Sequence, residues 1–413
     1  MRYDSERGGD YDGVMDRIQG QSKVVGVLDA ALMSGKLHHA YMFHGPVGVG
    51  KYSTAVEFAK VVLCLDPVTD LRGKVAACGA CKSCQLFKPI ETATFGVDEQ
   101  REQADHDERR GNEGDDEGGL KGAHPDLHVV VKELARYSDD ANIRNRKLTS
   151  IPVQVIQEAV LDKAYKKPVM GKGKVFIIDE AELMNAFGQN AILKTLEEPA
   201  PGSVFILVTS SEDRLLPTIR SRCQRIGFVP LGDDVVRRWL ERHEAEVMRG
   251  LDDEMREWLI GFSGGSLGRA ELVVKYGLFE WAREVLPRIE GIATGRADGE
   301  LGGMMAGMVD AFAKAWCDGH DGASKEAANK MGAGLMWGMV AEHARRQMMM
   351  NAEQVGVGDL EQGENVMEPW ARVIEYVTEA EELYRSNVKI DMVCDHLVMK
   401  MTQAIYRCKA VGS

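Results

Sequence analysis

Residues 44–53 combine a glycine-rich loop with a lysine, a combination that can hold the phosphates of a nucleotide. They read His-Gly-Pro-Val-Gly-Val-Gly-Lys-Tyr-Ser, which is typical of a phosphate-binding P-loop. Glycines let backbone N–H groups close around phosphate oxygens, and a following helix N-terminus adds partial positive charge. We therefore predict nucleotide contacts from Gly45, Gly48, Gly50 and Lys51, with the lysine reaching the β- and γ-phosphates.

The residue after Lys51 does not fit this chemistry. The pattern G-x-x-x-x-G-K-[ST] places a hydroxyl there to hold Mg²⁺, whereas this chain has Tyr52. Ser53 cannot simply replace that hydroxyl, because successive helical residues are rotated by about 100°. Taken alone, the loop leaves three alternatives open: the chain hydrolyses nucleotide, only holds it, or does neither.

Four cysteines have the spacing of a metal site. Two consecutive C-x-x-C steps and one upstream cysteine supply four thiolates, enough for a tetrahedral Zn²⁺ ion; these are Cys64, Cys78, Cys81 and Cys84. A redox pair is the competing interpretation, but it leaves two of the cysteines without a role. We predict a structural zinc site, since a closed four-thiolate site has no open coordination position for chemistry.

Polar residues end two strongly apolar runs. Residues 175–178 predict a strand buried on both faces, as in a parallel sheet, and α/β sheets place ligands at the C-terminal ends of their strands. Asp179 is predicted to steer Mg²⁺ through water and Glu180 to polarise the attacking water; a solvated acidic turn is the alternative. Thr209 follows the run 204–208 and is predicted to sense the γ-phosphate, with a plain strand-end turn as the alternative.

The elements that would position these residues alternate between strand and helix. A helical lead-in over 16–37 precedes a predicted strand at 40–43 and a helix from 54 to about 64. Further along, 125–131 predicts a buried strand and 151–164 an amphipathic helix whose apolar side faces the sheet. The expected fold is therefore α/β, with a parallel sheet around the P-loop.

Length and composition bound the class of protein. The 413 residues suffice for two or three domains, and 44% hydrophobic with 28% charged residues is the composition of an ordinary soluble protein. No apolar run approaches the roughly 18–20 residues of a membrane span, and residues 1–13 lack the order of a signal peptide. The expected compartment is the cytoplasm, where the eight cysteines are more readily thiols or metal ligands than disulfides.

The net charge of −13 is partly local. Residues 98–117 carry ten acidic and three basic side chains. The surrounding segment 91–122 is poor in apolar residues, which predicts a disordered insertion; an acidic docking arm is the less favoured alternative. Neither part of the chain is a basic domain, so any DNA contact is expected to be shared with partner subunits.

The order of these motifs resembles bacterial DNA polymerase III clamp-loader subunits, which belong to the AAA+ class. The resemblance is dense over about residues 16–230. The motifs that carry it are Ile18-Gln19-Gly20-Gln21, the P-loop, the four-cysteine insert, the Asp-Glu strand end, Leu193-Lys194-Thr195-Leu196-Glu197-Glu198-Pro199 and Ser221-Arg222-Cys223. The last two are highly specific as a pair, and the P-loop alone is not.

The resemblance implies roles for two arginines. Arg222 is similar to the arginine finger that one subunit inserts into its neighbour's ATP site, where a guanidinium spreads charge over phosphate oxygens. A surface salt bridge is its alternative, and Arg220 is a less favoured, structural candidate. Arg269 corresponds to the sensor position of a small helical lid, which contacts bound nucleotide; the alternative is a glycine-broken helix connection.

The resemblance also implies the domain organisation. Residues 1–230 would form the AAA+ nucleotide-binding domain, with the zinc module at 64–84. Residues 231–275 would form the helical lid, and 276–413 an all-α collar that holds the subunits in a ring. The implied cofactors are structural Zn²⁺ and, as a candidate, ATP with Mg²⁺.

Two clamp-loader subunit types share these motifs. The motor type, gamma or tau, needs Thr after the P-loop lysine, whereas the delta-prime type often departs there. Tyr52, the Arg-Ser-Arg-Cys sequence at 220–223 and the lack of a long tau-like extension favour delta-prime. The retained Lys51 and the intact Asp-Glu pair point to nucleotide binding, although efficient hydrolysis is doubtful without the Mg²⁺ hydroxyl.

The sequence therefore predicts a delta-prime-type subunit of the clamp loader, which loads the sliding clamp onto primed DNA. It would supply an arginine finger and hydrolyse ATP poorly itself, with no polymerase active site. Its implied partners are gamma/tau and delta in a hetero-oligomeric ring, the sliding clamp, and primer–template DNA through the complex, with no membrane. The alternatives are an active gamma/tau ATPase motor and, least favoured, a stand-alone zinc-bearing nucleic-acid-binding protein.

Overall fold

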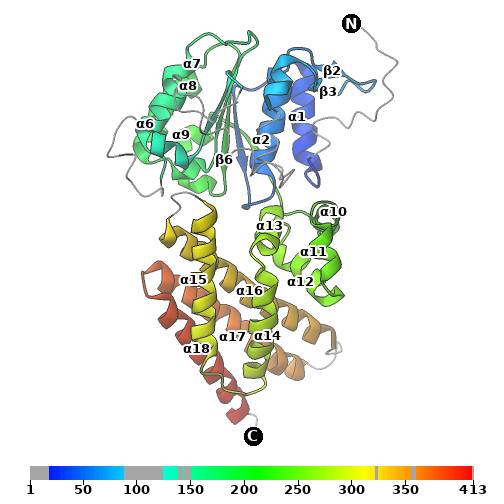
Figure 1. Cartoon of the computed structure of the whole chain (residues 1–413), viewed down its shortest axis with the longest axis vertical. Coiled ribbons are helices and arrows are strands. Elements are labelled where there is room, and N and C mark those ends of the chain that lie inside the picture. Colours follow the sequence, from blue (N-terminus) through cyan, green and yellow to red (C-terminus); the bar gives the residue numbers. More distant parts are fainter. Residues whose placement is uncertain are drawn as a thin grey trace. The chain divides into compact units, whose positions relative to one another are not determined.

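The computed structural model describes residues 18–87, 124–137, 143, 150–320, 324–354 and 360–411. The predicted insertion at 91–122 lies outside these residues. The chain divides into two compact units, residues 1–235 and 236–413, and each is described here by itself (Figure 1). The predicted boundary between lid and collar at residue 275 stays a prediction.

The first unit is built on a five-stranded, wholly parallel sheet with the strand order β4-β5-β6-β1-β7. The strands are β1 (Ala40–His44), β4 (Leu127–Val130), β5 (Lys174–Ile178), β6 (Ser203–Thr209) and β7 (Gln224–Gly227). A separate antiparallel pair, β2 (Val68–Thr69) and β3 (Val75–Ala76), belongs to the cysteine-rich region. The predicted α/β fold with a parallel sheet is confirmed.

Helices cover both faces of this sheet, so the central strands β5, β6 and β1 are buried on both sides. One face packs against α1 (Ser22–Ser34) and α2 (Lys51–Leu63), and the other against α6 (Val153–Ile156) and α8 (Ala186–Glu197) (Figure 1). Along β5, Val175 and Ile177 join the α1–α2 side, whereas Phe176 and Ile178 join the α6–α8 side. This alternation explains why the strand is an unbroken apolar run.

Several helix boundaries differ from the predicted ones. The helix predicted to begin at residue 54 begins at Lys51. The helix predicted over 151–164 is α6, one π-helical turn and α7. α8 begins at Ala186, because the side chain of Asn185 caps it by accepting the N–H of Gly188 at 2.8 Å. Apolar spacing identified the buried face of each segment but not these local changes.

The remaining elements of the first unit are short, apart from α10. They are η3 (Lys132–Tyr137), η4 (Gln157–Leu161), α7 (Asp162–Ala164), η5 (Ala181–Leu183), η6 (Glu212–Arg214), α9 (Pro217–Arg220) and α10 (Asp233–His243), which runs into the second unit. Residues 82–87 are also helical.

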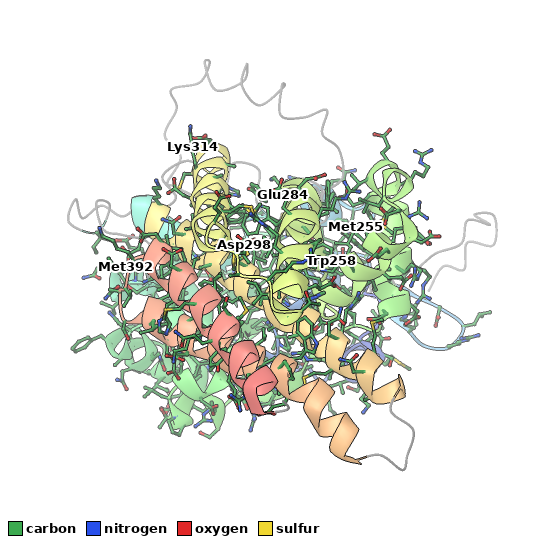
Figure 2. The ribbon with its side chains drawn as sticks, turned by 90° about the horizontal axis from the view of Figure 1, so that it is seen from below. Met255, Trp258, Glu284, Asp298, Lys314 and Met392 are labelled. Atoms are coloured by element: carbon green, nitrogen blue, oxygen red, sulfur yellow. The ribbon has the colours of Figure 1, made fainter. Side chains whose placement is uncertain are left out.

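The second unit is helical in its described part. Its helices are α11 (Ala245–Gly250), α12 (Asp253–Ser263), α13 (Leu267–Lys275), α14 (Leu278–Ala293), α15 (Leu301–Gly319), α16 (Lys325–Gln354), α17 (Leu360–Arg385) and α18 (Ile390–Val411). Figure 2 labels the buried Trp258 of α12 and, on the outer side of α15, the exposed Lys314. Among the described residues, no helix is long and apolar enough to span a bilayer.

A half-buried histidine on β4 is expected to make the first unit sensitive to acid. His128 stacks on Phe176 with ring centroids 4.8 Å apart, and its Nε2 has no hydrogen-bond partner among the described residues. Burial, followed by the charges of Lys163 and Lys174, lowers the pKa of His128 to about 4. Protonation is therefore easier in the unfolded chain, and stability is lost as the pH falls from about 6.5 toward 4.

We expect the wild type to lose about 1–2 kcal/mol more unfolding free energy than His128→Gln between neutral pH and about pH 5. Urea titrations at the two pH values measure this difference. His243→Gln, at an exposed position, is the matched control and should behave as the wild type. The same loss in wild type and His128→Gln would contradict the prediction.

Candidate nucleotide and metal sites

The P-loop connects the end of β1 to the start of α2. Gly45, Gly48 and Gly50 all have positive φ, at 142°, 75° and 91°. At Gly45 a Cβ would lie 2.4 Å from the carbonyl oxygen of Phe228, so the close approach to the chain after β7 also requires glycine. Both the backbone conformation and the packing therefore explain why glycines occupy these predicted phosphate-binding positions.

Lys51 is the first residue of α2 and is only 7% exposed. Its Nζ donates hydrogen bonds to the carbonyl oxygens of Gly45, at 2.8 Å, and Pro46. Burial lowers the pKa of Lys51, and the charges of Glu182 and Asp179 oppose that shift. The ammonium group is thus held inside the loop, near the carboxylates that follow β5.

Tyr52 follows Lys51 in α2 and packs against the apolar core. Its ring is half-buried and packs against the core on the α1–α2 side of the sheet. Burial, followed by the charge of Asp179, raises the pKa of Tyr52 to about 12. A bulky phenol therefore takes the place of the short hydroxyl that the P-loop pattern puts near the predicted Mg²⁺ position.

The two predicted carboxylates differ in their surroundings. Burial raises the pKa of Asp179 to about 6, against a hydrogen bond from the N–H of Glu180, which lowers it. Glu180 has a left-handed backbone conformation, with φ 46° and ψ 46°, and its carboxylate pairs with Lys132 Nζ at 2.7 Å. Such strain in a non-glycine residue is typical of functional sites.

Sequence reasoning missed Glu182, which also belongs to this group. It is half-buried and accepts hydrogen bonds from Ser210 N at 3.0 Å and Ser210 Oγ at 2.5 Å. Burial raises its pKa, but the hydrogen bonds from Ser210 and Thr209 outweigh this, and the pKa of Glu182 is lowered. The sequence did contain a signal for Glu182: it lies three residues after Asp179, in the turn that follows β5.

Thr209 is buried at the end of β6, as its predicted position requires. Its Oγ1 accepts the N–H of Ser211 at 3.1 Å, so the hydroxyl also stabilises the turn after the strand. Thr209 and Glu182 share the C-terminal edge of the sheet with Lys51. A role in sensing nucleotide stays a prediction.

Gln21 explains why the N-terminal motif accompanies the P-loop. Its side chain is buried, and its Nε2 donates to the carbonyl oxygens of Val229, at 2.7 Å, and Val49, at 3.4 Å. Its Oε1 accepts the N–H of Val229 at 3.3 Å. Gln21 thus fastens the P-loop to the segment after β7.

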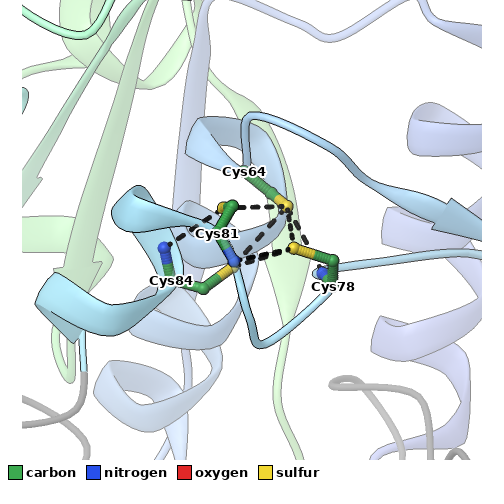
Figure 3. A group of neighbouring side chains, drawn as sticks. All are labelled: Cys64, Cys78, Cys81 and Cys84. Atoms are coloured by element: carbon green, nitrogen blue, oxygen red, sulfur yellow. Dashed lines mark hydrogen bonds between the residues drawn. The ribbon is translucent and has the colours of Figure 1, made fainter.

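The four predicted zinc ligands converge on one point (Figure 3). Their sulfur atoms all lie within 4.8 Å of one another. Cys64 Sγ is 3.6 Å from Cys78 Sγ and 3.6 Å from Cys84 Sγ, and the Cys64–Cys81 and Cys78–Cys84 separations are 3.9 Å. Zn–S bonds of about 2.3 Å in a tetrahedron place sulfurs about 3.8 Å apart, so the cluster fits a Zn²⁺ ion.

The surroundings favour a thiolate at Cys64, whereas burial raises the pKa of Cys78 and the hydrogen bond to Cys64 raises the pKa of Cys84. Backbone N–H groups donate to three of the sulfurs, from Cys78 to Cys64, from Cys81 to Cys78 and from Cys84 to Cys81, at 3.3–3.4 Å. The hydrogen bond from the Cys84 thiol lowers the pKa of Cys64 to about 5. The sulfur separations are far too long for a disulfide, and all four thiols are free.

A buried hydrogen-bond chain connects this module to the sheet. Asp126 N donates to His124 Nδ1 at 3.1 Å, so the proton of His124 is on Nε2, which donates to Ser83 Oγ at 2.9 Å. Ser83 Oγ in turn donates to the Leu63 carbonyl at 2.8 Å. The cysteine module is therefore fastened both to the end of α2 and to the start of β4.

The predicted finger, Arg222, lies just after α9 and is bound to the other highly specific motif. Its guanidinium pairs with the carboxylate of Glu197 and donates to the Thr218 carbonyl at 2.8 Å. Both side chains of the ion pair are partly exposed, whereas the adjacent Cys223 is buried in the core. The fold thus holds Arg222 at the surface, close to the end of α8.

The other two arginines have local partners. Arg220 Nη1 pairs with the exposed Asp213 at 3.3 Å. Arg269 lies in the first turn of α13, where its Nη1 donates to the Phe262 carbonyl at 3.3 Å and its guanidinium lies over the Phe262 ring. Burial lowers the pKa of Arg269, and the charge of Glu342 opposes the shift. Contact of Arg269 with nucleotide stays a prediction.

A parallel five-stranded sheet with a P-loop at one strand end and an Asp-Glu pair at another has the architecture of the AAA+ class. A family model described as DNA polymerase III, delta subunit, matches residues 20–232, just over half of the chain. The chain belongs to this family of clamp-loader subunits.

Relatives of both subunit types are found at the same identity. DNA polymerase III subunit delta' of Pseudomonas aeruginosa is 30% identical over 254 residues, 62% of this chain and 60% of that protein. DNA polymerase III subunit gamma/tau of Mycobacterium bovis is 30% identical over 249 residues, 60% of this chain and 34% of that protein. The match therefore spans about three fifths of the first relative and a third of the second.

A solved structure is also similar. The DNA polymerase III gamma subunit-related protein of Thermotoga maritima is 14% identical and has a TM-score of 0.40, covering 92% of this chain and 98% of that one. At that score the likeness supports no further conclusion.

Proposed function

We propose that this chain is a delta-prime-type clamp-loader subunit that completes a neighbour's ATP site and hydrolyses little or no ATP itself. The observation that carries this proposal is Tyr52, whose half-buried ring packs against the core and stands at the position where the P-loop pattern has a Mg²⁺-binding hydroxyl. Loss of that hydroxyl removes one fixed ligand of the ion that neutralises charge in phosphoryl transfer.

The catalytic carboxylate supports the same proposal. Glu180 would have to orient a water molecule, but its carboxylate is paired with Lys132 at 2.7 Å. In contrast, the retained Lys51, which the Gly45 carbonyl holds inside the loop, and the positive φ of the three glycines support phosphate binding. When bound, ATP would be held by Lys51 and the loop N–H groups, with Asp179 as the residue for Mg²⁺.

The finger would act in trans. Arg222 is partly exposed. Its guanidinium pairs with the carboxylate of Glu197 and donates to the carbonyl of Thr218, and these two contacts orient the plane of the guanidinium. If a neighbouring subunit brought the γ-phosphate of its bound ATP to this surface, the phosphate would meet a positive charge that is already oriented. ATP binding at such junctions would shape a ring that opens the sliding clamp, and primer–template DNA would trigger hydrolysis and release. The cysteine module would hold structural Zn²⁺, and the expected location is the cytoplasm.

The second candidate function is the gamma/tau motor of the same complex. It is favoured by the intact Lys51 and Asp179-Glu180, and relatives of that type match as well as delta' does. The two candidates separate by the ATP turnover of the purified chain, measured alone and with motor subunits added. Substantial turnover alone that disappears in Lys51→Ala would overturn the delta-prime proposal.

Restoring the missing hydroxyl tests the part played by Tyr52. We expect Tyr52→Thr to make nucleotide binding depend on Mg²⁺, tightening it by about 10-fold when the ion is added. It should also cost about 1–3 kcal/mol of stability, because the packed ring is lost. Isothermal titration with a non-hydrolysable ATP analogue, with and without Mg²⁺, measures the effect.

The matched control is Tyr52→Phe, which keeps the ring and adds no short hydroxyl. It should respond to Mg²⁺ as the wild type does. A wild-type chain that already binds nucleotide more tightly by the same factor with Mg²⁺ would show that Tyr52 does not impair the ion site.

A further inference from the structure

A run of lysines lies at the edge of the sheet opposite the P-loop. Residues 163–174 contain five lysines and no acidic residue, although the whole chain carries a net charge of −13. β5 begins at Lys174 and is followed at its other end by Asp179, so this lysine run belongs to the amino-terminal edge of the parallel sheet. The local charge of residues 163–174 is therefore positive, opposite in sign to the net charge of the chain.

The lysines of this run lie close together in space. Lys174 is buried, and its Nζ donates to the carbonyl oxygen of Lys163 at 2.6 Å. After burial and the opposing charge of Asp126, the charges of Lys166 and Lys163 lower the pKa of Lys174. Lys166, Lys167 and Lys172 themselves are exposed. The run therefore presents three ammonium groups to solvent, those of Lys166, Lys167 and Lys172.

Buried contacts fix the shape of the loop that carries them. Asp126 is fully buried, and its two carboxylate oxygens accept the N–H groups of Val169, at 2.7 Å, and Met170, at 2.6 Å. At the end of the run, Lys174 N donates to the Gly202 carbonyl at 3.1 Å. The loop between the exposed lysines is thus fastened at its centre and at its end.

An exposed aromatic ring accompanies the lysines. Tyr165 is 57% exposed, and its hydroxyl donates to the Glu198 carbonyl at 3.2 Å. The hydroxyl is hydrogen-bonded, whereas the ring is exposed. In the sequence, Tyr165 stands between Lys163 and Lys166. Exposed rings between basic side chains are how proteins bind nucleic-acid strands, with lysines on phosphates and rings on bases.

We propose that residues 163–174 form a binding surface for the phosphate backbone of nucleic acid, with Lys166, Lys167 and Lys172 on phosphates and Tyr165 stacking on a base. An acidic peptide would use the lysines, but a nucleic-acid strand supplies both a phosphate for the lysines and a flat base for the exposed ring at every nucleotide, so a nucleic-acid strand fits better. The surface is separate from the P-loop and Arg222, and the proposal does not depend on their function.

The test is fluorescence anisotropy of the full-length chain with a short labelled single-stranded oligonucleotide over a range of salt concentrations. The variant is the triple substitution Lys166→Gln, Lys167→Gln and Lys172→Gln. We expect it to weaken binding by about 10-fold or more at low salt and to reduce the slope of log K against log salt by about 2–3. Tyr165→Ala should weaken binding of a single strand more than that of a duplex.

A charge-matched control uses three exposed lysines of the helical unit, Lys275, Lys314 (Figure 2) and Lys389, each changed to Gln. It loses the same charge and should keep the wild-type salt slope. If thermal unfolding shows that the first triple variant is not folded, the single variants Lys166→Gln and Lys172→Gln are measured instead. Each is expected to lower the slope of log K against log salt by about 1.

Three results would overturn the proposal. They are the absence of salt-dependent binding by the wild type, equal binding by the lysine variant and its control, and binding of labelled polyglutamate as tight as that of DNA of equal charge. The last result would identify the surface as a site for acidic peptides.

Discussion

Replacing Arg222 with alanine is expected, on the proposed function, to slow hydrolysis at the neighbouring ATP site by about 10³-fold or more. The reason is that the developing charge on the transferred phosphoryl group loses a fixed guanidinium. Folding should be little affected, because a partly exposed ion pair such as that with Glu197 is worth about 0–1 kcal/mol. Single-turnover hydrolysis in the complex with motor subunits measures the effect. It shows the slow phase of one ATP site even while the other sites hydrolyse at their normal rate.

Two substitutions separate the finger from general charge effects. Arg225→Ala removes an exposed arginine only three positions away, which pairs with Glu212 at 2.5 Å, and should leave hydrolysis unchanged. Arg222→Lys keeps the charge but loses the planar fork, so it should restore only part of the rate. If Arg222→Ala and Arg225→Ala gave the same rate, Arg222 would be a surface ion-pair residue and no more.

Features encoded by neighbouring residues were predictable from the sequence. The cysteine cluster follows from residue type and short spacing, since Cys78, Cys81 and Cys84 lie within seven residues and need only one further ligand. The two-sided burial of β5 follows from its unbroken apolar run. In both cases the local pattern admits few other structures.

Pairings between distant residues were not predictable. Lys132 precedes its partner Glu180 by almost fifty positions in the sequence. Both β6 and α9 lie in the sequence between Glu197 and its partner Arg222. These contacts depend on which strand lies beside which, and no spacing rule within one element contains that information. The packing of the Tyr52 ring against the core is of the same kind: the sequence shows that the hydroxyl is missing, but not what its replacement touches.

Net charge describes the whole chain and not its local surfaces. From the value of −13 the sequence predicts that any DNA contact is shared with partner subunits, and this stays a prediction. Charges act over about a Debye length, roughly 8–10 Å at moderate salt, so a compact group of lysines has its own field. A sum over the chain cannot detect it.

Loss of the metal should have the second large effect. We expect about one zinc per chain, lost on Cys81→Ser, with the free energy of unfolding of the α/β unit lowered by about 3–5 kcal/mol. The effect extends beyond the module, because Cys64 ends α2 and the Ser83–His124 hydrogen bond fastens the module to β4. Zinc binding should also weaken as the pH falls, since the ligands must be thiolates.

Metal analysis of the purified chain and thermal unfolding with and without a chelator measure these two quantities. Cys317→Ser, outside the cluster, is the matched control and should keep both the metal and the stability. Ser83→Ala separates the two contributions: it keeps all four ligands and should keep the zinc, while losing stability because the Leu63 carbonyl and His124 lose their shared partner. A well-folded, metal-free wild type whose melting temperature a chelator leaves unchanged would refute the zinc site and leave the cysteines as a hydrogen-bonded thiol cluster.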